Sequence, residues 1–277
     1  MEGLSVPKLP LDDWTDHALD FLTENVAFFT KAISEHLENM IVHIVDGLMY
    51  FPPWLVIAIF SMIAWQLAGR KVSLFTAVGF CLIWNLRLWE PTIETLTLVI
   101  VATLMTVLLG IPMGILAALS KTAYRIIMPL MDFMQTMPAF VYLIPAIPFF
   151  GLGAVSAIFS TVVFAMPPAI RLTCLGIKQV PPELIEAADA FGSTPFQKLF
   201  KVQLPLAIPT IMAGINQTIM LALSMVVIAA MIGAGGLGSE VWKAIQRLEA
   251  GMGFQAGIAI VILAMILDRI SQKMGHK

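Results

Sequence analysis

Residues 181–205 read PPELIEAADAFGSTPFQKLFKVQLP, a polar stretch between two long apolar runs. The two prolines suit the first turn of a helix, because the first N–H groups of a helix have no partner within it. Gly192 is suited to end that helix. Thr194 and Gln197 have the spacing of a capping box, with Pro195 in the first turn of a second helix. The stretch therefore predicts two short helices that meet at a glycine.

The composition of the whole chain is that of a membrane protein. Of 277 residues, 59% are hydrophobic and 12% are charged, and the mean hydropathy is +0.89. A soluble domain carries about 25% charged residues, so the numbers argue against a soluble enzyme. The net charge of −2 gives no basic excess for binding nucleic acid. Cys81 and Cys174 lie in apolar runs and predict buried thiols, not a disulfide framework or a zinc site.

Seven apolar runs approach the roughly 20 residues that a membrane-spanning helix needs. We therefore expect an all-α polytopic membrane protein, with two accessory transmembrane helices over 53–89 and a core of five over 90–277. The seven predicted spans are approximately 53–69, 72–88, 92–119, 126–150, 154–171, 205–232 and 256–270.

The distribution of charge predicts which side of the membrane each connection faces. Lysine and arginine gather on alternate connections, and such residues favour the cytoplasmic side. The connection over 172–204 is therefore expected in the cytoplasm. The acidic segment 1–52 is expected outside, because it holds only two basic residues, Lys8 and Lys31. Seven spans then place the C-terminus inside.

The acidic segment also has a helical period. Over residues 14–50, apolar side chains recur every three or four residues, which predicts an amphipathic helix. Its stripe either lies on the outer leaflet or docks on a partner subunit, and the acidic opposite face favours the second interpretation. The stripe consists of Leu19, Leu22, Val26, Phe29, Ile33, Leu37, Ile41 and Ile44.

The polar stretch also carries a motif that resembles the EAA signature of ABC importer permeases. That signature is E-A-A, three residues, G, nine residues and I-x-L-P. The chain departs from it only by valine in place of isoleucine. The matching residues are Glu186, Ala187, Ala188, Gly192, Val202, Leu204 and Pro205.

Longer stretches resemble the permeases of glycine betaine and proline betaine importers, and the resemblance covers most of the chain from about residue 50. The accessory helices and the acidic outer segment also resemble this subgroup. The stretches are DFMQTMPAFVYLIP at 132–145, GIKQVP at 176–181, GINQTIMLALSMVVIAA at 214–230 and GAGGLG at 233–238.

The resemblance implies a type I ABC importer transmembrane domain that carries quaternary ammonium compatible solutes across the bacterial cytoplasmic membrane. It implies a second copy of the chain, two ATPase subunits and an extracytoplasmic substrate-binding protein as partners in the lipid bilayer. GAGGLG lacks the lysine and hydroxyl residue of a phosphate loop. We therefore expect no catalytic residue and no cofactor in this chain, with Mg-ATP bound by the partner ATPase. Choline or carnitine is the alternative substrate.

Three groups of residues are candidates for function. The EAA residues would couple the chain to the ATPase. An intramembrane carboxylate is a functional candidate, so Asp132 either serves the pathway or pairs with a basic residue on another helix. Asn216 and Gln217 either line the pathway or bridge helices. The full pathway set is Asp132, Met134, Met137, Phe140, Asn216, Gln217 and Met220, and the binding-protein docking set is Gly235, Gly236, Glu240, Lys243 and Arg247.

The sequence argues against two other classes of membrane protein. An ion-coupled secondary transporter should show inverted repeats or paired broken helices, and neither is clear in the sequence. A membrane-embedded enzyme needs a nucleophile, a base or a metal cluster. The histidines all fall outside the predicted spans, so no metal site is expected; they are His17, His36, His43 and His276.

Overall fold

The computed structural model describes residues 10–274, and within this range it contains helices and no strands. Twelve α-helices follow one another along the described chain, with a π-helical segment η2 (Leu199–Gln203) and two 3-10 turns, η1 (Ala139–Tyr142) and η3 (Ala230–Ile232). The α-helices are α1 Leu11–Tyr50, α2 Pro53–Ala68, α3 Arg70–Asn85, α4 Trp89–Leu119, α5 Lys121–Thr136, α6 Leu143–Phe150, α7 Ala154–Lys178, α8 Pro182–Ala190, α9 Pro195–Lys198, α10 Leu204–Ala229, α11 Gly236–Arg247 and α12 Ala250–Met274.

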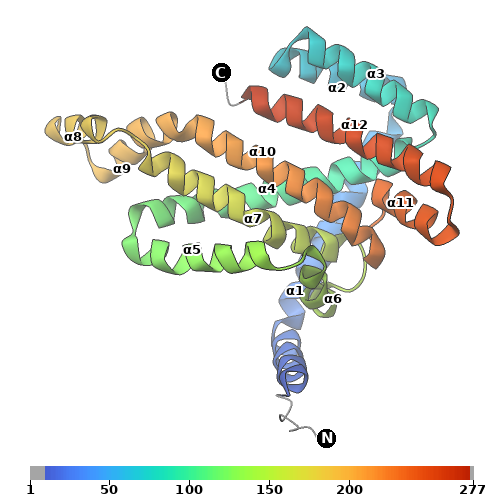
Figure 1. Cartoon of the computed structure of the whole chain (residues 1–277), viewed down its shortest axis with the longest axis horizontal. Coiled ribbons are helices and arrows are strands. Elements are labelled where there is room, and N and C mark those ends of the chain that lie inside the picture. Colours follow the sequence, from blue (N-terminus) through green and yellow to red (C-terminus); the bar gives the residue numbers. More distant parts are fainter. Residues whose placement is uncertain (1–9, 275–277) are drawn as a thin grey trace, which may run out of the picture.

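Helices α4, α7 and α10 form the centre of the bundle, with α12 alongside α10 (Figure 1). Small residues let these helices approach closely, as is usual between membrane helices. An ideal Cβ at Gly114 of α4 would lie 2.6 Å from Thr173 Cβ and 2.7 Å from the Ile170 carbonyl oxygen of α7. A Cβ at Gly214 of α10 would lie 3.1 Å from the Pro168 carbonyl oxygen of α7. Helix α7 is therefore held tightly on both sides.

The number of helices able to cross a membrane differs from the seven predicted. Within residues 10–274, four helices are long and apolar enough, or up to six if each of two bent pairs counts as one span. Helices α2 and α3 have 16 residues each, about 24 Å at 1.5 Å per residue, against a hydrocarbon core of about 30 Å. They form an accessory hairpin whose turn is at Gly69, with φ +90°.

The predicted span over 126–150 was wrong as a single helix. Helix α5 and the segment Ala139–Phe150, which comprises η1 and α6, are bent by 114° relative to each other. Met137 leaves the helical region, with φ −73° and ψ 135°, because the proline that follows disfavours the α conformation of the residue before it. The segment therefore turns back on itself as a broken span or a re-entrant loop.

The amphipathic helix predicted over 14–50 is present as α1, and it crosses the bundle instead of joining it. The chain bends by 105° between α1 and α2, and the N-terminal part of α1 projects beyond the other helices (Figure 1). Ile41 is buried in the main core, but Phe29 and Ile33 of the same stripe are exposed. Ile44, the last residue of the stripe, is again exposed, so Ile41 is the one buried member among the described residues.

The polar stretch over 172–204 is more helical than a surface loop. Helix α7 continues to Lys178. Beyond α8, the segments α9, η2 and α10 join end to end, so that the helical segment over 195–232 is 38 residues long. The two short helices predicted from the capping residues are confirmed as α8 and α9.

The close contact of α4 with α7 yields a test. Gly114→Ala should lower the free energy of unfolding by about 1–3 kcal/mol, because the new methyl group overlaps a carbonyl oxygen of α7 and the helices must separate. The measurement is the thermal unfolding midpoint of the purified chain in detergent. Gly257→Ala is the matched control, since a Cβ there meets nothing within 4 Å and alanine favours a helix over glycine. Equal destabilisation by both variants would contradict the proposed packing.

Candidate functional site

The coupling element consists of α8, α9 and the turn between them, and its shape follows from local hydrogen bonds. Gly192 lies just beyond the end of α8 with φ +72°, a conformation that glycine adopts without strain. Its N–H donates to the Asp189 carbonyl at 2.9 Å, and the Ser193 N–H donates to the Ala188 carbonyl at 3.0 Å. These two bonds make a Schellman motif, which satisfies the last carbonyls of α8.

Helix α9 begins with the capping box that the sequence predicted. The Gln197 N–H donates to Thr194 Oγ1 at 3.2 Å, and the Thr194 N–H donates to Gln197 Oε1 at 3.0 Å. Lys198 Nζ then reaches back to both oxygens of Asp189, at 2.7 and 2.8 Å. The two short helices are thus tied together by local bonds and by one ion pair.

The EAA residues divide between an inner and an outer side. Ala188 is buried, whereas Glu186 and Ala187 are exposed. Val202 lies in η2, and the adjoining Leu199 is buried with Ile177 of α7 and residues of α10. Leu204 and Pro205 begin α10. Leu199 therefore anchors the segment that follows the coupling element to α7 and α10, and the acidic residue of the signature stays exposed.

Exposed aromatic side chains on this element were not singled out from the sequence. Phe191 is 90% exposed and Phe196 is 69% exposed. The Phe196 ring lies 4.3 Å from that of Phe200, centre to centre. The sequence signal for this exposed aromatic surface is the presence of Phe191, Phe196 and Phe200 in an otherwise polar stretch. Large apolar groups that a single chain leaves uncovered mark a surface for a partner.

The predicted pathway residue Asp132 pairs with a basic residue. Arg171 Nη2 of α7 donates to Asp132 Oδ1 of α5, and both residues line a cavity of about 330 Å³ with Lys178. Of the two interpretations of Asp132, pairing with a neighbouring helix is the one observed. Arg171 Nε is buried without a partner among the described residues. The pair joins α5 to α7.

Asn216 bridges two helices. Its Nδ2 donates to Asp268 Oδ1 of α12 at 3.0 Å, and its Oδ1 accepts from Ser271. Gln217, one position along, is exposed. Of the two interpretations of Asn216, the bridge between α10 and α12 is the one observed, while Gln217 faces away from the core of this chain.

The remaining pathway candidates occupy different environments. Met134 packs on the cluster that contains Met131 and Cys174, and Met137 packs on the cluster around Tyr142. Phe140 and Met220 are exposed. Met134 and Met137 therefore pack within this chain, and the two exposed side chains are available to a second chain or to a pathway.

The glycines predicted to take part in docking, Gly235 and Gly236, lie where α11 meets α4. The Gly236 N–H donates to Glu94 Oε2 at 2.6 Å, and the Leu237 N–H donates to Thr95 Oγ1 at 2.8 Å. Gly236 is buried and has φ +72°, and a Cβ at this position would overlap Thr95. Side chains of α4 thus cap the N-terminus of α11, where a carboxylate is favoured. No local pattern predicts this contact, because it joins residues 142 positions apart.

The exposed part of the predicted docking face lies further along α11. Lys243 Nζ pairs with Glu240 Oε1 at 2.7 Å, and Arg247 is exposed. Leu248 follows with φ 58° and is 91% exposed. The left-handed backbone conformation is energetically unfavourable for leucine, and it is unusual for a leucine with an exposed side chain to adopt it. Helix α11 lies at the end of the bundle opposite α8 and α9 (Figure 1).

No group of three or more histidine, cysteine, aspartate or glutamate residues in the described part of the chain is arranged to hold a metal ion.

The cap on α11 yields a second test. Glu94→Ala should lower the free energy of unfolding by about 1.5–3 kcal/mol, because the Gly236 N–H loses a charged acceptor. Glu94→Gln keeps an acceptor oxygen without the charge and should be intermediate. Chemical or thermal unfolding in detergent measures both. Identical stability of Glu94→Ala and the parent chain would show that this bond contributes nothing.

Comparison with known proteins identifies the family of this chain. Residues 110–274 match the family described as binding-protein-dependent transport system inner membrane component. The chain is 53% identical to the glycine betaine transport system permease protein OpuAB of Bacillus subtilis, over 98% of this chain and 96% of the relative. It is 52% identical to the glycine betaine/carnitine transport permease protein GbuB of Listeria monocytogenes, over 99% and 98%.

A solved structure shares the fold. It is an inward-facing conformation of the MetNI methionine ABC transporter, with 25% identity and a TM-score of 0.62, covering 66% of this chain and 92% of that one. The chain belongs to the inner-membrane permease components of binding-protein-dependent transport systems, and its fold is that of an ABC importer transmembrane subunit.

Proposed function

We propose that this chain is the permease subunit of an ATP-driven importer for glycine betaine and related quaternary ammonium solutes such as proline betaine. The observation that carries the proposal is the similarity to glycine betaine permeases over nearly the whole chain. Carnitine is the second candidate substrate, because one such relative is named for it. Uptake of such solutes would protect the cell against osmotic stress.

The coupling element would be the surface on which a separate ATPase acts. Its exposed Phe191 and Phe196 supply apolar area, and Glu186 supplies a charge for the rim of the contact. Such an arrangement, with aromatic anchors inside and polar groups outside, is typical of a protein interface. Because α9 continues through η2 into α10, a displacement of the element would tilt α10 as a rigid rod.

The transporter we propose contains two copies of this chain, two ATPase subunits that bind Mg-ATP, and a substrate-binding protein. The binding protein would deliver solute at the α11 end, where Lys243, Arg247 and Leu248 are exposed. Solute would pass between the two copies, past the exposed side chains of Phe140, Gln217 and Met220. In the contact with the binding protein, charged groups at the rim such as Lys243 and Arg247 would chiefly set the rate at which the two proteins associate.

We further propose an orientation. The coupling element lies in the cytoplasm, and the acidic segment 1–52 lies outside. The lysines and arginines of the connections support this orientation, as does the position of α11 at the end of the bundle opposite α8 and α9 (Figure 1).

The central test is uptake by proteoliposomes that contain this chain, its ATPase and its binding protein. Labelled glycine betaine should accumulate only when ATP and all three proteins are present, and excess unlabelled carnitine should compete if it shares the route. Uptake driven by an ion gradient without ATP would instead identify a secondary transporter.

Gly192 provides a test of coupling. Gly192→Val should reduce solute uptake and stimulation of the ATPase together, because a β-branched residue at φ +72° is strained and the turn between α8 and α9 must change. Gly192→Asn should retain most activity, since asparagine tolerates the left-handed region. Both variants should insert at the level of the parent chain. Full activity of Gly192→Val would refute a role for this turn.

Labelling of introduced cysteines tests the orientation. In a background with Cys81 and Cys174 replaced by alanine, a cysteine at Glu35 should react with an impermeant thiol reagent in intact cells. A cysteine at Glu183 should react only after the membrane is opened. Both native glutamates are exposed, so burial does not bias the comparison. The reverse pattern would overturn the orientation.

A further inference from the structure

Helices α3 and α12 pack closely around Gly79, and a pocket lies between them toward the C-terminal end of α12. At the contact, an ideal Cβ on Gly79 would lie 2.6 Å from Ile262 Cγ2, so glycine is needed for this approach. Further along, Lys71 and Phe75 of α3 lie opposite Met265 and the last turns of α12. The space between them is a pocket of about 590 Å³, which we call the α3–α12 pocket.

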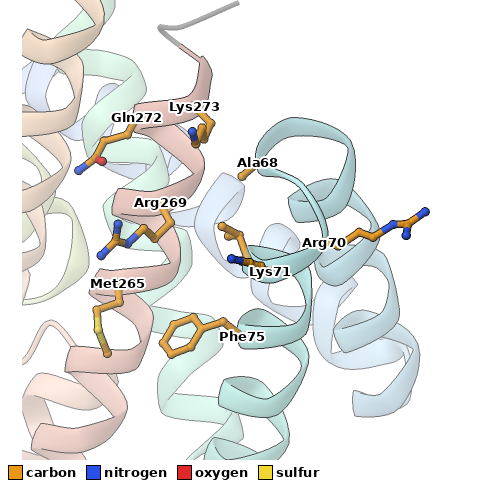
Figure 2. A pocket seen from close by; sticks show the side chains of 9 residues that line it. Ala68, Arg70, Lys71, Phe75, Met265, Arg269, Gln272 and Lys273 are labelled. Atoms are coloured by element: carbon orange, nitrogen blue, oxygen red, sulfur yellow. The ribbon is translucent and has the colours of Figure 1, made fainter.

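The α3–α12 pocket is basic at its rim and apolar inside. Four of the nine described residues that line it are basic. Figure 2 shows Lys71 and Phe75 projecting from α3 toward α12, which carries Met265, Arg269 and Lys273. None of the described lining residues is acidic.

The positive charge of this pocket is not balanced within the part of the chain that the structure describes. The carboxylate on the same stretch of α12, Asp268, accepts hydrogen bonds from Asn216 at 3.0 Å and from Gln272 at 2.7 Å. Lys71, Arg269 and Lys273 form no ion pair with a described residue. Three cations at one site repel one another unless an anion joins them.

The pocket also lies at the level where a membrane surface is expected. It is formed by the N-terminal end of α3 and the C-terminal end of α12, which is one of the four helices long and apolar enough to span a membrane. Its polar rim is therefore at a helix end, and its apolar part extends toward the hydrocarbon. Basic pockets between membrane helices at such a level bind lipid head groups.

We propose that the α3–α12 pocket binds an anionic phospholipid. The lipid phosphate would lie among Lys71, Arg269 and Lys273, and the beginning of an acyl chain would lie along Phe75 and Met265. The apolar interior favours a lipid over free phosphate, because a small hydrated anion gains nothing from those two side chains. The bound lipid would join the accessory hairpin to the core of the permease.

Native mass spectrometry of the full chain in detergent tests this proposal. Phosphatidylglycerol and phosphatidylcholine with the same acyl chains are the probes, and the retained lipid is counted for each. Lys71→Gln with Lys273→Gln should reduce retained phosphatidylglycerol about tenfold, since each basic residue near a charged lipid surface contributes appreciably. Lys121→Gln with Lys201→Gln is the control, because both lysines are exposed and the same charge is removed.

The expected result is a loss of phosphatidylglycerol that is confined to the pocket variant, with phosphatidylcholine unchanged. An equal loss in the control variant would mean that overall charge, and not this pocket, attracts the lipid. Retention unchanged in the pocket variant would overturn the proposal outright. Displacement of phosphatidylglycerol by millimolar inorganic phosphate would identify the pocket as a phosphate site and reject the lipid.

Discussion

The close packing of α7 between α4 and α10 is the constraint on which the rest of the molecule depends. Helices in lipid gain little from hydrophobic burial against one another, so close backbone approach and hydrogen bonds must hold them together. Gly114 supplies that approach on α4, and Gly214 supplies it on α10. Thr218 Oγ1 of α10 adds a hydrogen bond to the Ala165 carbonyl of α7 at 3.2 Å. A displacement of either α7 or α10 therefore displaces the other helix.

The same packing holds both helices to which the coupling element is attached, α7 and α10. The element follows α7 directly and runs into α10 without a break, so both of its attachments lie in the tightly packed centre. The far end of α10 leads through η3 to α11, which Glu94 and Thr95 fix to α4. Under the function proposed above, a displacement of α8 would pass through α10 to the end of the bundle where α11 lies. Loose connections would absorb the same displacement locally.

Features determined by neighbouring residues could be predicted from the sequence, and features determined by distant contacts could not. The turn at Gly192 and the capping box at Thr194 follow from short-range hydrogen bonds, and both are present. The break at Met137 had a local cause in Pro138, but the apolar run around it favoured one continuous span. The partner of Asp132 lies 39 positions away, and no local pattern identifies it among several basic residues.

Gly192 and Gly236 show that glycines with the same backbone conformation can occupy different surroundings. Both have φ +72°, so a side chain at either position strains the backbone. A Cβ at Gly192 meets nothing within 4 Å, whereas a Cβ at Gly236 would overlap Thr95. The first glycine therefore shapes an open surface, where a partner can bind, and the second closes a buried contact. A glycine-rich sequence predicts the turn, but whether the turn faces solvent or another helix is decided by the packing of α4, which the sequence of the turn does not contain.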